Sequence, residues 1–145
     1  MNILILVTLF ILLLCRIKYT PMNLSKTVWK KRTINAIERN KQIDIDEDER
    51  TIEKGIAITI SFFVELFLII FYIILGNEID TTEFIVLSEL QIISCLWELL
   101  INIKDIHLVF YSTDINDFTY RRFNRLFNLI LDYIYYPWAI YMLLK

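Results

Sequence analysis

The sequence predicts an all-α protein, an integral membrane helix bundle with about four transmembrane helices and a cytoplasmic helical loop after the first. Three observations lead to this prediction. Hydrophobic residues make up 57% of the 145 residues, above the roughly 45–50% that is usual in soluble domains. These residues are gathered into four apolar runs, and the basic residues are concentrated between the runs. The chain is therefore expected to form a single membrane domain, residues 1–145.

The first span is predicted over residues 3–19. Its apolar part, Ile3 to Cys15, is short for a bilayer core that needs about 20 helical residues. A signal peptide is disfavoured, because no Lys or Arg precedes the run and no small-residue cleavage site follows it. We therefore expect an uncleaved span in which Arg16 and Lys18 snorkel to the interface and Tyr19 lies at headgroup depth.

Three further spans are predicted over residues 55–75, 84–103 and 126–144. The second and third are joined by a short acidic segment, GNEIDTTE, that contains no basic residue. Aromatic residues in the last span are arranged like an interfacial aromatic belt. They are Tyr133, Tyr135, Tyr136 and Trp138. Pro137 is expected either to kink this helix or to mark the interface.

The distribution of Lys and Arg predicts the orientation in the membrane. Ten of the 15 basic residues lie in residues 16–54, none in 76–83, four in 104–126 and one at Lys145. Because basic loops stay on the cytoplasmic side, loops 20–54 and 104–125 are predicted to be cytoplasmic. The two termini are then outside, and the protein is predicted to be a multi-pass protein of the plasma membrane.

The first loop is predicted to contain a helix over residues 23–42, with Asn23 or Ser25 as its cap. Its apolar residues do not form one stripe, so either an interfacial helix or a solvated basic linker fits the sequence. The acidic run from Asp44 to Glu49 suits the positive end of the next helix. Basic residues of both loops are candidates for binding lipid phosphates, or serve topology alone. They are Lys30, Lys31, Arg32, Arg121, Arg122 and Arg125.

Carboxylic acids inside the predicted spans are the main candidates for function, because a charge at the bilayer centre is costly unless it faces protein or water. Glu65, Glu98 and Asp132 each lie on a polar stripe of their helix, at depths within about 8 Å of one another at a rise of 1.5 Å per residue. We therefore predict one intramembrane polar cluster. Its members are Glu65, Glu98, Asp132, Gln91, Asn128 and Ser61.

Two interpretations of this cluster remain open from the sequence. In the structural one, protonated carboxyls and amides join the helices by hydrogen bonds, in a chain that has no GxxxG motif for close packing. In the functional one, the acids bind or relay a proton or cation. At least one acid is expected to be protonated, since neighbouring like charges disfavour ionisation of both.

The sequence contains no pattern that predicts catalysis, a metal site or a cofactor. His107 is the only histidine, and Cys15 and Cys95 form no CxxC motif. We expect a non-catalytic interaction, accessory or immunity and defence-type membrane protein. The alternative is an oligomeric proton or cation channel or transporter. The expected partners are membrane lipid and either a second copy or another membrane protein, and nucleic acid is not expected.

Overall fold

The computed structural model describes residues 3–42, 47–112 and 114–145, and within these ranges the regular structure is entirely helical. The helices are α1 (Ile3–Leu24), α2 (Lys26–Gln42), α3 (Glu47–Ile79), α4 (Thr82–Tyr111), the short 3-10 helix η1 (Ile115–Asp117) and α5 (Arg122–Leu144). The prediction of an all-helical chain is confirmed.

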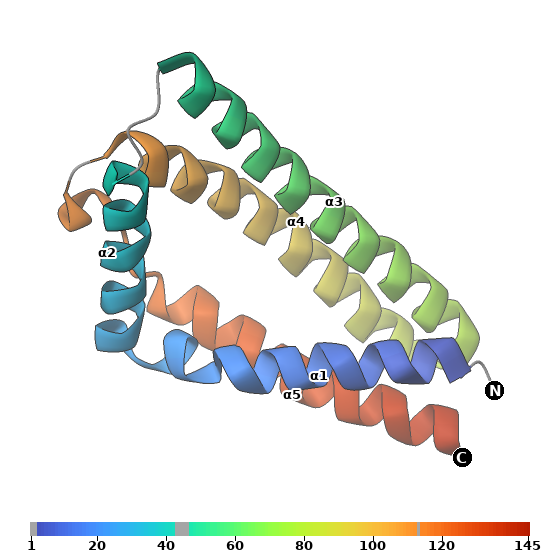
Figure 1. The fold of residues 1–145 in the computed structure, drawn as a ribbon. Helices are drawn as coiled ribbons and strands as arrows, with labels where there is room; N and C mark the ends of the chain where they lie inside the picture. Colours follow the sequence, from blue (N-terminus) through green and yellow to red (C-terminus); the bar gives the residue numbers. More distant parts are fainter. Residues whose placement is uncertain (1–2, 43–46, 113) are drawn as a thin grey trace.

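The long helices form two antiparallel pairs, α3 with α4 and α1 with α5. Figure 1 shows that the pairs meet near the two termini and the α3–α4 turn, and diverge toward the other end, where α2 lies across the opening. The α3–α4 turn is tight because Asp80 adopts a left-handed conformation, φ 46°, and its N–H donates to the carbonyl oxygen of Gly76 at 3.1 Å. This bond caps the end of α3.

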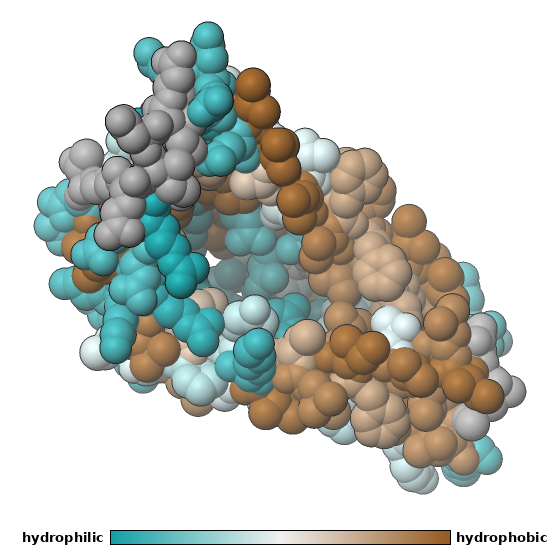
Figure 2. Space-filling view, in the orientation of Figure 1, coloured by the Kyte–Doolittle hydropathy of each residue, from teal (hydrophilic) through white to brown (hydrophobic). Residues whose placement is uncertain are grey.

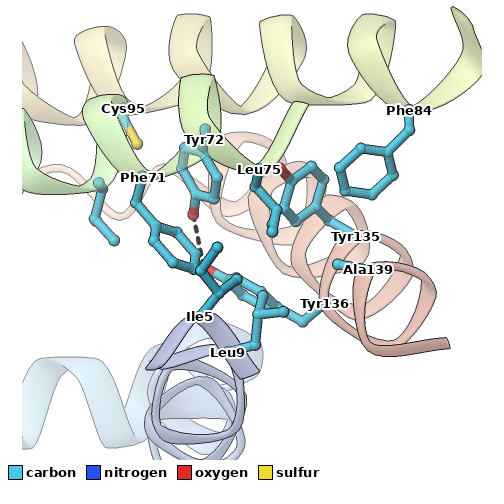
Figure 3. Packing of buried hydrophobic residues seen from close by; sticks show 11 residues of the cluster. Ile5, Leu9, Phe71, Tyr72, Leu75, Phe84, Cys95, Tyr135, Tyr136 and Ala139 are labelled. Carbon is cyan, nitrogen blue, oxygen red and sulfur yellow. Dashed lines mark hydrogen bonds between the residues drawn. The ribbon is translucent and has the colours of Figure 1, made fainter. Parts of the chain in front are cut away.

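The main core lies where the two helix pairs meet (Figure 3). Its largest fully buried side chains are Tyr72, Tyr135, Tyr136, Phe84, Leu9 and Leu75. Buried tyrosine hydroxyls need partners, and here they pair across helices, Tyr72 with Tyr136 at 2.6 Å and Tyr135 with Ser88 at 2.9 Å. A Cβ added at Gly76 would lie 3.2 Å from Ser88 Oγ, so glycine permits the close approach of α3 and α4 here.

A second, smaller core holds α2 against the segment that follows α4. Trp29 and Ile37 are buried together with Phe118, and the rings of Trp29 and Tyr120 lie 5.2 Å apart. The helix begins after Ser25, whose Oγ accepts from the N–H of Val28 at 3.4 Å. The protein therefore differs from the solvated-linker alternative, because α2 is a helix that is docked on the bundle.

Three helices of the described chain, α1, α3 and α4, are long and apolar enough to cross a membrane. Each is longer than the span predicted for it, since α1 continues to Leu24, α3 begins at Glu47 and α4 runs to Tyr111. In α5, Asn128, Asp132 and the tyrosines lower the hydropathy, and α5 is not among the three. Pro137 lies inside α5 without ending it. Of the predicted acidic run, Asp44 and Asp46 lie outside the described residues.

Candidate functional site

An ion pair between α1 and α5 lies at the centre of the polar interior. Arg16 Nε is 2.9 Å from Asp132 Oδ2, and the Asp132 side chain is only 3% exposed. The sequence predicted that Arg16 would snorkel to the interface. It turns inward instead, because α1 extends eight residues beyond Arg16 and Asp132 offers a buried partner at the same level.

The same carboxylate also joins the α1–α5 pair to α4. Gln91 Nε2 donates to Asp132 Oδ1 at 3.1 Å, and both residues are buried. Each oxygen of Asp132 thus has a different partner, a guanidinium from α1 and an amide from α4. A buried carboxylate that is both paired and hydrogen-bonded avoids most of the cost of its desolvation.

The other two predicted acids are held by asparagines. Asn128 of α5 donates to Glu98 Oε1 at 2.6 Å, and Asn102 of α4 donates to Glu65 Oε1 at a long 3.4 Å. Glu65 is 6% exposed, and its second oxygen, Oε2, is buried without a hydrogen-bond partner among the described residues. The buried Cys95 thiol of α4 also lies beside the Glu65 carboxyl. Glu65 has the longest amide bond of the three acids and a buried oxygen, Oε2, that is without a partner in the described part of the chain.

A cavity of about 210 Å³ connects these groups with the end of the bundle that α2 covers. Arg16, Glu98, Asn128 and Asp132 line it on one side, and Asp105, Arg121 and Arg125 line it nearer to α2. Figure 2 shows the corresponding hollow, framed by α1, α2 and α3, with hydrophilic residues on its floor. The polar interior is therefore reached from the side of the molecule that carries the basic segments.

Most of the predicted cluster lies along this interior. Gln91, Asn128, Asp132 and Glu98 are linked around it as described above. Ser61 lies apart, one turn before Glu65, in a groove between α3 and α4 that Asn102 and Asp105 also line. Arg16 was not predicted to be a member of this cluster, but it lines the same cavity. Its position in the sequence could have indicated this role. Arg16 comes directly after an apolar run that is too short to cross the bilayer, so a helix that spans the bilayer must continue past it.

The six predicted basic residues divide into two groups. Lys30, Lys31, Arg32 and Arg122 are exposed. Arg121 and Arg125 line the cavity instead, with Arg121 3.4 Å from Asp105.

Arg125 is held in place by polar and aromatic neighbours. Its Nη1 donates to Asn23 Oδ1 at 3.3 Å, and its guanidinium lies 5.9 Å from the ring of Trp29 and 5.6 Å from the ring of Tyr120. These contacts tie the start of α5 to α2 and to the end of α1.

His107 is exposed, and its ring packs edge-on against Tyr111 with centroids 5.0 Å apart. Across the described ranges, no group of three or more His, Cys, Asp or Glu side chains is arranged to hold a metal ion. In comparisons with protein-family models, curated proteins and solved structures, none matches this chain.

Replacing Arg16 by methionine should destabilise the protein by about 3–5 kcal/mol, because Asp132 is then a buried charge without its cation. Adding Asp132→Leu should restore much of this loss, since an apolar pair of similar size often replaces a buried ion pair at little cost. The free energy of unfolding in mixed detergent micelles measures both effects. Lys18→Met, two residues away and exposed, is the matched control. If Arg16→Met and Lys18→Met have equally small effects, the ion pair does not stabilise the fold.

Proposed function

We propose that this chain is a non-catalytic, multi-pass membrane protein that acts as an interaction or accessory component, in the manner of an immunity or defence factor, through its α2 face. One observation carries the proposal. Trp29 and Ile37 anchor α2 across the open end of the bundle, which leaves its other face exposed. The exposed basic residues of α2 are Lys26, Lys30, Lys31, Arg32 and Arg39, and of these Arg32 also contacts α1 through Met22 and the ring of Tyr19.

The state of the intramembrane acids supports a structural role for them. Asp132 is paired with a guanidinium, Glu98 accepts a short amide hydrogen bond, and Glu65 Oε2 is a buried carboxyl oxygen without a hydrogen-bond partner among the described residues. Three guanidiniums, those of Arg16, Arg121 and Arg125, line the polar cavity and raise the energy of a cation that passes through it. The cavity therefore disfavours cation passage, and the bonds around Asp132 favour a network that joins the helix pairs.

Changing Lys30, Lys31 and Arg39 together to glutamine should abolish the partner complex, because exposed charges of α2 are lost while its buried anchors and the contacts of Arg32 with α1 are kept. Blue-native electrophoresis of membranes from cells that express the chain naturally measures the complex. Glu65→Gln is the comparison and should migrate as the wild type does. The proposal is wrong if the triple variant keeps the complex or if Glu65→Gln alone loses it.

The membrane arrangement that we propose has α5 as the fourth span, both basic loops in the cytoplasm, and both termini outside the plasma membrane. With 23 residues, α5 is about 34 Å long at 1.5 Å per residue, enough for a hydrocarbon core of about 30 Å. Its antiparallel packing along α1 supports a shared span. The chain ends and the non-basic α3–α4 turn also lie at one end of the bundle, opposite α2 (Figure 1).

Cysteine labelling tests this arrangement. In a variant with Cys15 and Cys95 replaced by alanine, Asn2→Cys should react with a membrane-impermeant maleimide in intact cells. Asn35→Cys, on the exposed part of α2, should react only after permeabilisation. The opposite pattern would reverse the orientation, and reaction of both sites in intact cells would place the termini and α2 on the same side.

The second candidate is an oligomeric proton or cation channel or transporter. The unpartnered Oε2 of Glu65 and the cavity beside Glu98 favour it. We expect liposomes that contain the folded protein to show no proton or cation flux above that of empty liposomes. A flux that disappears in Glu65→Gln at matched incorporation would instead establish the acid as a conduction or transport site.

A further inference from the structure

A second opening lies between α1 and α3, and it differs in character from the polar cavity. Its volume is about 670 Å³, within the range of about 300–1,000 Å³ that is typical of small-molecule sites. Its walls are mostly apolar, with Leu12 on α1 and Ile60, Phe63 and Phe67 on α3. The side chains of Ile60, Phe63 and Phe67 are more than half exposed, so this groove opens sideways, where acyl chains would lie.

The floor of the groove is polar. Glu65, Glu98 and Asn102 line it together with Arg16. Glu65 contributes the unpartnered Oε2, buried on a residue that is only 6% exposed. A buried acceptor without a donor costs about 1–3 kcal/mol, and more when it is charged. A ligand that brings a donor to this oxygen would remove that cost.

Formal charge indicates which kind of donor fits. Two carboxyls, those of Glu65 and Glu98, line the groove together with one guanidinium, that of Arg16, which is already paired with Asp132 at 2.9 Å. The next cations, Arg121 and Arg125, line the neighbouring cavity rather than the groove. Arg121 is paired there with Asp105. The floor of the groove therefore has a surplus of acidic groups, which favours a cationic head group over an anionic one.

We propose that the groove binds an amphiphile with a primary ammonium head and one apolar tail, which enters from the bilayer between α1 and α3. The ammonium, which has three donors and no acceptor, binds Glu65 Oε2. The tail lies along Leu12, Phe63 and Phe67. This site goes beyond the interaction role of α2 and rests on the proposed placement in the membrane, since the groove must face lipid to be loaded.

Photo-labelling in nanodiscs tests the site. The probe is a long-chain alkylamine with a diazirine in its tail, applied to the full chain in phosphatidylcholine discs, and labelled peptides are identified by mass spectrometry. Labels should map to residues 12–19 and 60–68. Excess dodecylamine should compete, whereas dodecanol and dodecyl sulfate should not. Loss of the charge-assisted bond in Glu65→Gln should reduce labelling about tenfold.

The matched control is Glu89→Gln, which removes an acid from the exposed face of α4, away from the groove, and should label as the wild type does. Phe63→Trp should narrow the groove and reduce labelling while Glu65 is intact. This second variant keeps the test decisive if Glu65→Gln fails to fold. Competition by dodecanol, or full labelling in both the Glu65 and the Phe63 variants, would overturn the proposal.

Incorporation of the folded protein into the discs is scored first by size-exclusion chromatography. Failure to enter the discs would contradict the membrane placement itself. Absence of labelling in well-formed discs would contradict only the ammonium site.

Discussion

The pairing of Arg16 with Asp132 is the constraint on which the remaining structure depends. Arg16 directly follows an apolar run, and its guanidinium can turn into the bundle because a carboxylate meets it at the same level. This requirement sets the relative height of α1 and α5 and the faces that they turn toward each other. Gln91 binds the second oxygen of Asp132 and so carries the constraint to α4. Since α3 is the hairpin partner of α4, one ion pair relates both helix pairs.

The two ends of the bundle then have different roles. At the end with the termini, buried tyrosines and Phe84 pack between the two helix pairs. The tyrosine hydroxyls form hydrogen bonds with side chains of other helices. At the other end the pairs diverge, and α2 closes the gap through its own small core around Trp29 and Phe118. The divergence creates the polar cavity and the apolar groove, which meet at Arg16 and Glu98. The basic face of α2 is thereby held in a fixed position beside the cavity.

Much of this arrangement was predictable from helical phase, and the rest depends on contacts between distant residues. The polar stripes predicted that Glu65, Glu98 and Asp132 would face the interior, and each is held there by an amide or a guanidinium. Ser61 shares its phase with Glu65, but it lies one turn earlier and lines the groove between α3 and α4 rather than the polar cavity.

Arg16 was misplaced because the end of an apolar run usually marks an interface, whereas α1 continues through Pro21 to Leu24. The docking of α2 had no local signal, since the partners of Trp29 lie about 80 to 90 residues further along the chain.

The most direct test of this account is the distance between the Arg16 side chain and the Asp132 carboxyl in a lipid bilayer. Solid-state NMR with ¹⁵N-labelled arginine and ¹³C-labelled aspartate, compared with the Asp132→Asn variant, measures the dipolar coupling of the pair. The account predicts a measurable coupling between Arg16 Nε and the Asp132 carboxyl carbon that the variant loses, since Arg16 Nε lies 2.9 Å from Asp132 Oδ2. An uncoupled, mobile Arg16 would show that it snorkels to the interface, and the bundle would then need another explanation for its polar interior.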